Sequence, residues 1–189
     1  MGRGRFSAGG RGSAAREAGH AFTLIELLTV LAIVAILSAI VLGAGRRATE
    51  AGRISRARAE LAALAAALEG YRRQHGEYPV TGDAAVLLQS LIGRQGPTQA
   101  AISSRLRLDL TRFVTDADKD PFSAADAVLV DPWGQPYRYV YKVPAAGWTN
   151  PGYVLYSIGP DGRDAPALLA GGEPDAAADA NRDNLHANP

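Results

Sequence analysis

The longest apolar stretch of the chain runs from residue 22 to residue 44 and contains one charged residue, Glu26. As a helix it would be about 34 Å long, enough to cross a hydrocarbon core about 30 Å thick. Apolar residues occupy all sides of this helix, which a membrane span requires and a half-buried soluble helix does not. The small residue Ala21 precedes the stretch, whereas a secretory signal peptide carries its small residues after a shorter apolar core. We therefore predict a transmembrane or filament-core helix over residues 22–44.

The pattern changes to a one-sided helix over residues 45–76. Apolar residues recur at intervals of three and four from Ile54 to Tyr71, which places them on one face of a helix. The opposite face carries charged residues, including Glu60. No proline interrupts residues 22–78, so one helix can continue from the apolar stretch to the end of this segment. We predict that the apolar stripe packs against a small sheet.

Residues 77–189 have the mixed pattern of a small globular head. It is predicted to begin with a short apolar helix at 84–92 and a charged variable loop at 93–130. Two strands follow at 137–143 and 153–158, and a C-terminal loop with few core-forming residues occupies 159–189. Tyrosines alternate with other residues in the first strand, and a turn-rich connection joins it to the second, as in a hairpin. The sequence therefore predicts an α+β fold, with a long N-terminal helix packed on a small antiparallel sheet.

The composition excludes several kinds of chemistry. The 189 residues include no cysteine, which rules out disulfides, thiolate zinc sites and cysteine nucleophiles. A formal net charge of +1 does not indicate nucleic-acid binding. No G-x-S-x-G, P-loop or H-E-x-x-H motif occurs, and the three histidines have no partners at metal-ligand spacing. We predict a structural protein rather than an enzyme, with no nucleic-acid partner.

Glu26 is the residue that most restricts the function. An ionised carboxylate inside a membrane span costs on the order of 2–3 kcal/mol and usually has a partner. No basic residue of the span supplies one, but a cut between Ala21 and Phe22 would create an α-amino group at that depth. The amino terminus of one subunit could then neutralise Glu26 of its neighbour and generate a helical stack. The alternative is a carboxyl group that reaches the interface or is protonated.

The sequence AFTLIELLTVLAIVAIL, residues 21–37, resembles the processing signal of type IV pilins and pseudopilins. The resemblance implies that residues 1–21 are a leader, that a prepilin peptidase cuts just before Phe22, and that the new N terminus is methylated. It also places Glu26 at the position of the family's glutamate. This chain has Ala21 where the family almost always has glycine.

Three stretches of the head are similar to the major pseudopilin of type II secretion systems. They are GYRRQHGEYP, DPWGQPYRYVY and YVLYSIGPDG, at residues 70–79, 131–141 and 153–162. This resemblance implies a pilin-like fold and a structural subunit of a helical filament that helps to export folded proteins. The implied partners are further copies of the chain, the prepilin peptidase, the minor pseudopilins, the assembly ATPase and the platform protein. The implied location is the inner membrane, crossed once, with the head in the periplasm.

The DPWGQPY segment also has a local physical interpretation. Asp131 can accept hydrogen bonds from the backbone of a turn, and Gly134 permits that turn. Trp133 and Tyr137 can then pack over the apolar stripe of the helix. We predict that this segment is a folding element and has no catalytic role.

The resemblance further implies a calcium ion in the loop that follows the S-x-G-x-D-G motif. Calcium takes about six to eight oxygen ligands, from carboxylates and carbonyls. Asp161 matches the family's aspartate, and Ile158 stands where the family offers a carbonyl. Asp175 and Asp179 could complete the site. Extra residues separate the motif from the Gly-Gly pair at 171–172, so a solvated acidic tail is the alternative.

A second acidic motif lies in the variable loop. The D-x-D-x-D pattern that begins at Asp116 opens like an EF-hand loop. However, Pro121 stands where that loop needs glycine, and Ala127 stands where it needs glutamate. We predict a solvated loop here.

Arginines at five positions follow the apolar stretch closely: 46, 47, 53, 56 and 58. The positive-inside rule alone would place them in the cytoplasm, against the topology implied by the resemblance, although a long domain can be translocated despite its charge. Two other functions stay open. One is a type IV pilin or a minor pseudopilin, and the other is an uncleaved, membrane-anchored periplasmic module whose head binds a partner.

Overall fold

The computed structural model describes residues 23–105, 108–143 and 146–187, and for residues 41–46 it describes the backbone alone. The chain divides into two compact units, residues 1–45 and 46–189, which we describe separately. The first unit contributes the beginning of a long helix. The second contains the rest of that helix and all of the remaining structure.

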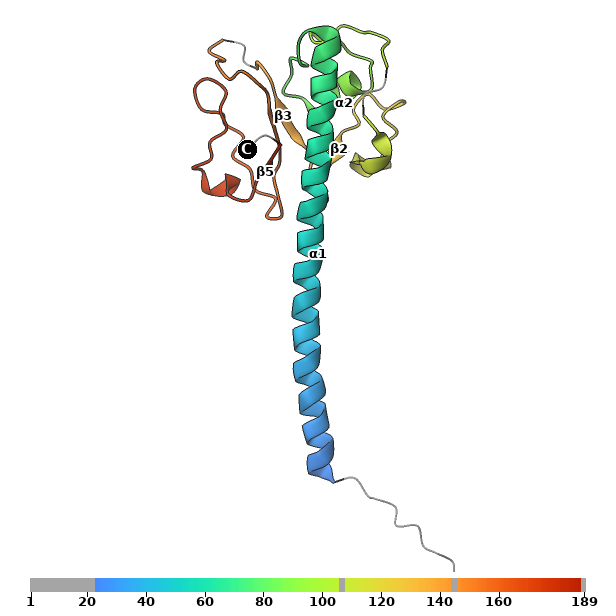
Figure 1. Cartoon of the computed structure of the whole chain (residues 1–189), viewed down its shortest axis with the longest axis vertical. Helices are drawn as coiled ribbons and strands as arrows, with labels where there is room; N and C mark the ends of the chain where they lie inside the picture. Colours follow the sequence, from blue (N-terminus) through green and yellow to red (C-terminus); the bar gives the residue numbers. More distant parts are fainter. Residues whose placement is uncertain (1–22, 106–107, 144–145, 188–189) are drawn as a thin grey trace, which may run out of the picture. The chain divides into compact units, whose positions relative to one another are not determined.

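Helix α1 runs from Leu24 to His75 without a break, as the absence of proline predicted (Figure 1). In the second unit the predicted stripe is confirmed, because its residues from Ala57 onward are buried at intervals of three and four: Ala57, Leu61, Leu64, Leu68 and Tyr71. The helix ends where Gly76 adopts a φ of +80°. The Gly76 N–H donates to the carbonyl of Arg72 at 2.7 Å, which is a common way to satisfy a carbonyl in the last turn of a helix.

The head contains two small antiparallel sheets, which confirms the predicted fold class. Strand β1 (Val114–Thr115) pairs with β2 (Leu129–Val130). The larger sheet has the order β3-β4-β5, with β3 at Arg138–Val140, β4 at Val154–Ser157 and β5 at Leu185–His186. The predicted hairpin is thus β3 and β4. Strand β5 was not predicted, because it comes from the end of the C-terminal loop.

Short helices complete the head. They are α2 (Ala84–Leu91) and the 3₁₀ helices η1 (Leu110–Arg112), η2 (Asp116–Asp118) and η3 (Asp179–Asn181). Asp83 caps α2, since its side chain accepts hydrogen bonds from the backbone N–H groups of the first turn. The predicted variable loop is therefore structured in part, because η1, β1, η2 and β2 all lie within it.

The core of the second unit forms where the head meets α1. Its largest fully buried side chains include three tyrosines, Tyr71 from α1 and Tyr137 and Tyr139 from the first strand region. The predicted alternation holds, since Tyr139 is buried while its neighbour Arg138 is exposed. In Figure 1 the β3-β4-β5 sheet lies on one side of the C-terminal part of α1, and α2 with the variable loop lies on the other.

Candidate functional site

The first candidate site is the amino-terminal turn of α1. The Thr23 hydroxyl oxygen accepts a hydrogen bond from the Glu26 N–H at 3.2 Å, so Thr23 caps the helix. The Thr29 hydroxyl in turn donates to the carbonyl of Glu26 at 2.9 Å. The carboxyl group of Glu26 is exposed in this first turn. Ala21 and Phe22, the residues of the predicted cut, lie outside the described residues.

The apolar part of α1 exposes its side chains on every side. The large apolar residues described between positions 24 and 40 are each between 52% and 82% exposed. Such a surface is far larger than the apolar patches that a soluble monomer normally shows. In the part of the chain that the structure describes, no helix is both long enough and apolar enough to cross a membrane.

Carboxylates of α1 hold the DPWGQPY segment. The Tyr137 hydroxyl donates to Oε2 of Glu60, and Nε of Arg56 lies 2.7 Å from Oε1 of the same carboxylate. Glu60 is only 4% exposed, which corrects the prediction that it lies on a solvated face. The Trp133 indole donates to Glu50 at 3.0 Å. A buried carboxylate with partners on both oxygens is stable, whereas one that loses a partner is not.

The turn within this segment is organised by Asp131. One carboxylate oxygen accepts from the backbone N–H groups of Trp133 at 3.0 Å and Gln135 at 2.9 Å. The other accepts from the Ser157 hydroxyl at 2.6 Å and so connects the turn to the end of β4. Gly134 has a φ of +87°, as a tight turn requires. The contacts agree with the predicted role as a folding element.

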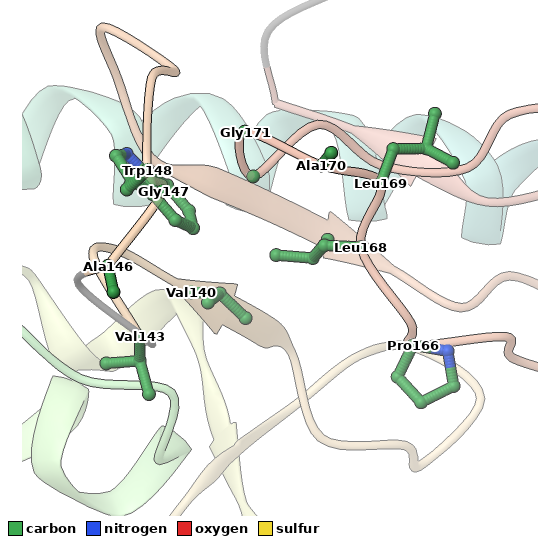
Figure 2. A pocket seen from close by; sticks show the side chains of 11 residues that line it. Val140, Val143, Ala146, Gly147, Trp148, Pro166, Leu168, Leu169, Ala170 and Gly171 are labelled. Atoms are coloured by element: carbon green, nitrogen blue, oxygen red, sulfur yellow. The ribbon is translucent and has the colours of Figure 1, made fainter.

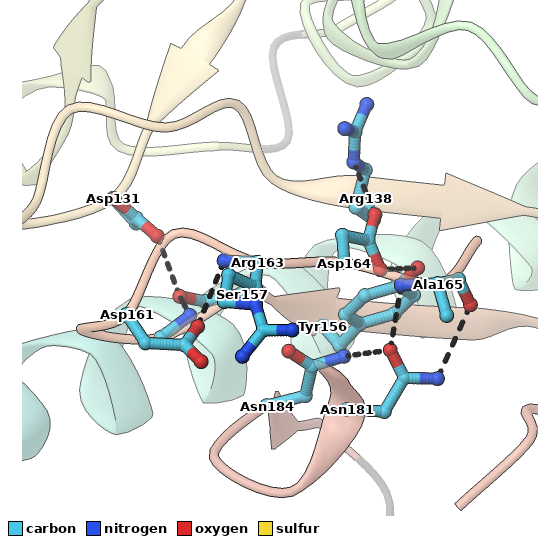
Figure 3. Close-up of polar contacts among 11 residues, drawn as sticks. Asp131, Arg138, Tyr156, Ser157, Asp161, Arg163, Asp164, Ala165, Asn181 and Asn184 are labelled. Atoms are coloured by element: carbon cyan, nitrogen blue, oxygen red, sulfur yellow. Dashed lines mark hydrogen bonds and ion pairs between the residues drawn. The ribbon is translucent and has the colours of Figure 1, made fainter. Parts of the chain in front are cut away.

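The predicted calcium ligands occupy different parts of the C-terminal loop. Ile158 is buried just after β4, while Asp161 accepts from the N–H of Arg163 at 2.8 Å (Figure 3). Asp175 accepts from a backbone N–H two residues later, and Asp179 forms an exposed ion pair at 2.9 Å with the arginine three residues on. Among the described residues, no three acidic or histidine side chains form a group that could hold a metal. The three predicted carboxylates are therefore not brought together.

Asp183 is the carboxylate that the structure places beside Asp161. Its Oδ2 accepts from the Asp161 N–H at 3.1 Å, and its Oδ1 is buried without a hydrogen-bond partner. A Cβ on Gly159 would lie 2.5 Å from the Asp183 carbonyl oxygen, so only glycine fits there. No local pattern predicts this contact, because Asp183 lies 22 residues after its partner, in the stretch for which a solvated tail was the alternative.

The extra residues after the S-x-G-x-D-G motif are tied to the sheet by polar contacts (Figure 3). Asp164 bridges two strands, since it pairs with Arg138 of β3 and accepts from the Tyr156 hydroxyl of β4, both at 3.0 Å. The Asn181 side chain exchanges hydrogen bonds with the backbone of Ala165. Burial raises the pKa of Tyr156, and the nearby Asp164 carboxylate adds to the rise. This part of the loop is thus held by side chains that sequence reasoning missed.

Comparisons with known proteins identify the family. A family model described as type II secretion system (T2SS), protein G, matches residues 46–169. A model described as the prokaryotic N-terminal methylation motif matches residues 19–42. The type II secretion system core protein G of Pseudomonas aeruginosa is 30% identical over 144 residues, which are 76% of this chain and 84% of that protein. The chain belongs to the type II secretion system protein G family.

Membership of the protein G family confirms the resemblance to a major pseudopilin. The methylation-motif match includes Ala21, Phe22 and Glu26, the residues predicted to act in processing and assembly. The protein G match includes Ile158 and Asp161 but ends at residue 169, before the other candidate calcium ligands. No solved structure matches the chain significantly.

In this member of the protein G family, the late Gly-Gly pair supports Trp148. Gly171 and Gly172 have φ values of +94° and +90°, and a Cβ on Gly172 would lie 2.5 Å from the Trp148 ring. The carbonyl of Gly171 accepts from the backbone N–H groups of Thr149 and Asn150, both at 2.9 Å. Trp148 also lines an apolar cavity of about 540 Å³ (Figure 2). The pair therefore fixes the C-terminal loop to the connection between β3 and β4.

Proposed function

We propose that this chain is a structural subunit of the type II secretion pseudopilus and that it assembles into a periplasmic helical filament. The observation that carries the proposal is the apolar segment at residues 24–40, which is exposed on every side and has one carboxylate, Glu26, in its first turn. A surface of this kind needs a membrane or other copies of the chain around it. The protein G family supports a role in type II secretion.

The chain first resides in the inner membrane, with residues 22–44 as a single span and the head in the periplasm. A prepilin peptidase cuts between Ala21 and Phe22, and the new amino group is methylated. The methylation-motif match at residues 19–42 supports this step. Because Thr23 caps the helix, Glu26 stays in the first turn, close to the new amino terminus.

Glu26 then pairs with the amino terminus of a neighbouring copy. In an apolar filament core this pair removes most of the cost of an isolated carboxylate. The contact joins two different parts of the chain, and in this proposal it also displaces one copy along the axis of the other, so that it does not close into a ring. Repetition of the same contact generates a helical filament.

The filament acts together with the secretion machinery and performs no catalytic step of its own. An assembly ATPase and a platform protein draw subunits from the membrane, and minor pseudopilins associate with the same filament. The growing pseudopilus helps to move folded proteins out of the periplasm. The relative in Pseudomonas aeruginosa is named a core protein of this system, which supports the proposed role.

The C-terminal loop binds a calcium ion at Asp161 and Asp183 in this proposal. The fit rests on the Asp183 Oδ1 atom, which is buried without a partner and lies on the residue that contacts the Asp161 backbone. The carbonyl of Ile158 and water can supply further oxygen ligands. Asp175 and Asp179 do not belong to this set, because their carboxylates contact Ala177 and Arg182, whereas Asp161 also contacts Asp183. The ion would stabilise the approach of β5 to the loop after β4.

The intact mass of the membrane-extracted chain, together with electron microscopy of sheared filaments, tests the function. A mature chain that begins at Phe22 with one added methyl group, found in filaments, supports the pseudopilus subunit. A monomeric chain that still begins at Met1 would contradict it and favour a tethered head that binds a partner.

A further inference from the structure

Arginines surround α1 just after its apolar part. Arg47, Arg53 and Arg58 are exposed and form no ion pair with any residue that the structure describes, and we call them the basic collar. Successive helical residues point about 100° apart, so these side chains leave α1 in more than one direction. Arg56 differs from them, because it pairs with Glu60. The collar lies in the second unit, the same unit as the head.

A surface of a different kind lies on the variable loop. An open apolar hollow of about 340 Å³ is lined there by Phe113, Thr115, Pro121 and Phe122, together with Leu129 and two residues of η1. The edge of the hollow is not covered, since the Phe122 ring and the neighbouring Val114 side chain are both exposed. A hydrophobic hollow on the surface of a head is a common feature of contact sites between proteins.

Acidic residues follow Thr115, one of the residues that line this hollow. Asp118 is exposed, has a φ of +53° and has no partner among the described residues. It lies in a closed turn beside the hollow, because the Thr115 hydroxyl donates to the carbonyl of Lys119 at 2.6 Å. Lys119 does not neutralise Asp118, since its ammonium group pairs with Asp116 at 2.9 Å and Asp126 at 2.8 Å. We call Phe113, Thr115, Asp118 and Phe122 the loop face.

The collar and the loop face are chemically complementary. An arginine has an aliphatic stem that can cover apolar surface and a planar guanidinium that can pair with a carboxylate or stack on an aromatic ring. The chain already shows such a contact, because the Arg94 guanidinium lies 5.8 Å from the centre of the Phe122 ring. The charges are also separated along the chain. Residues 46–58 hold five arginines and one acidic residue, whereas residues 76–189 hold fourteen acidic and nine basic residues.

We propose that the basic collar of one copy binds the loop face of a second copy. This inference rests on the proposed function and identifies a contact between heads that is independent of Glu26. The loop face lies beside the C-terminal part of α1, whereas the collar comes earlier on the same helix (Figure 1). Two copies joined in this way are therefore displaced along α1, and such a head-to-tail contact builds an open helix rather than a closed ring.

A second copy explains more of the structure than anionic lipid headgroups do. Headgroups would pair with the collar but would leave the hollow and Asp118 uncovered. A neighbouring chain satisfies both surfaces at once. It also gives the arginines a partner on the periplasmic side of the membrane. Arginines that closely follow a membrane span usually lie on the cytoplasmic side.

Engineered cysteines test the contact, because the chain has none of its own. Asp118→Cys is combined in turn with Arg47→Cys, Arg53→Cys or Arg58→Cys in the full-length chain, and filaments are treated with a mild oxidant. At least one pair is expected to give a ladder of disulfide-linked multimers. Each copy then carries one cysteine in the collar and one in the loop face, so it can be linked to two neighbours. Each single variant should give no ladder, because it can join two copies at most.

The matched control combines Asp118→Cys with Arg73→Cys. Arg73 is also an exposed arginine of α1, but it lies about 30 Å further along the helix than Arg53. This pair should give no ladder. If it gives the same ladder as the collar pairs, the cross-links report random encounters and the proposal is wrong.

Charge exchange gives an independent readout. Arg53→Asp and Asp118→Arg should each reduce the amount of sheared filament, and the double variant should restore it. If wild-type filaments are present but no collar pair forms a ladder and no exchange restores assembly, the collar contact is wrong while the pseudopilus function stands. If such variants instead lose only flotation with phosphatidylglycerol vesicles, lipid headgroups are the partner and the proposal is also overturned.

Discussion

The hydroxyl of Tyr137 donates a hydrogen bond to the buried carboxylate of Glu60, across 77 positions of the sequence. This contact joins the DPWGQPY segment to the middle of α1. Burial raises the pKa of Tyr137, and the adjacent Glu60 raises it further, so the tyrosine remains a donor at any physiological pH. This buried polar pair acts together with the Trp133–Glu50 hydrogen bond and the apolar core to position the head against its own part of α1.

Tyr137→Phe is expected to lower the free energy of unfolding by about 1–3 kcal/mol, because it leaves an oxygen of a buried carboxylate without a donor. Urea unfolding of the detergent-solubilised chain, followed by tryptophan fluorescence, measures the loss. Tyr141→Phe is the matched control. Its acceptor, Glu77, is 37% exposed, so water can replace the lost donor and the loss should be smaller. Equal losses in the two variants would contradict the argument.

The elements that sequence analysis predicted correctly are those set by local periodicity. The stripe from Ile54 to Tyr71 has helical intervals, and its residues from Ala57 onward are buried on one face. In the same way, alternation directs Tyr137, Tyr139 and Tyr141, which lie in and beside β3, toward the core. Both patterns depend on neighbours within one element, so they can be read without knowing the rest of the fold.

The features that were missed depend on contacts between distant segments. Helical periodicity alone places Glu60 on a solvated face, because it cannot show that Tyr137 and Arg56 enclose the Glu60 carboxylate. Strand β5 has only two residues and forms because β4 supplies its partners. Asp183 meets Asp161 for the same reason, since β5 begins two residues later. No pattern of period two or 3.6 carries that information.

Glu26→Ala should leave insertion and processing unchanged but reduce filament assembly strongly. The variant lacks the carboxylate proposed to pair with the neighbour's amino terminus, whereas the processing residues Ala21 and Phe22 are intact. Intact mass reports cleavage, and the amount of sheared filament reports assembly. Glu173→Ala removes an exposed carboxylate from the head and serves as the control. Normal filaments from Glu26→Ala would refute the pairing.

Calcium removal should lower the melting temperature of the wild-type chain, because a ligand that binds the folded state stabilises it. Asp183→Asn should abolish the response to a chelator, since it alters the carboxylate with the buried, unpartnered oxygen. Asp179→Asn should keep the response, because Asp179 pairs with Arg182 at the surface. Thermal scans with and without a chelator distinguish the two variants. A wild-type chain that shows no shift would remove the calcium proposal.

Alkaline pH should destabilise the head through its buried tyrosines. Burial raises the pKa of Tyr71 from 10.0 to about 12. The unfolded chain therefore loses this proton first, and the stabilisation that is complete below pH 10 is lost as the pH rises toward 12, by about 1.4 kcal/mol per pH unit for one group. Urea unfolding at pH 8 to 11, with tyrosinate absorbance as a second probe, measures the slope. In Tyr71→Phe the free energy of unfolding should fall less steeply with pH, because one titrating group has been removed. An unchanged slope would contradict the assignment to Tyr71 and show that another group titrates.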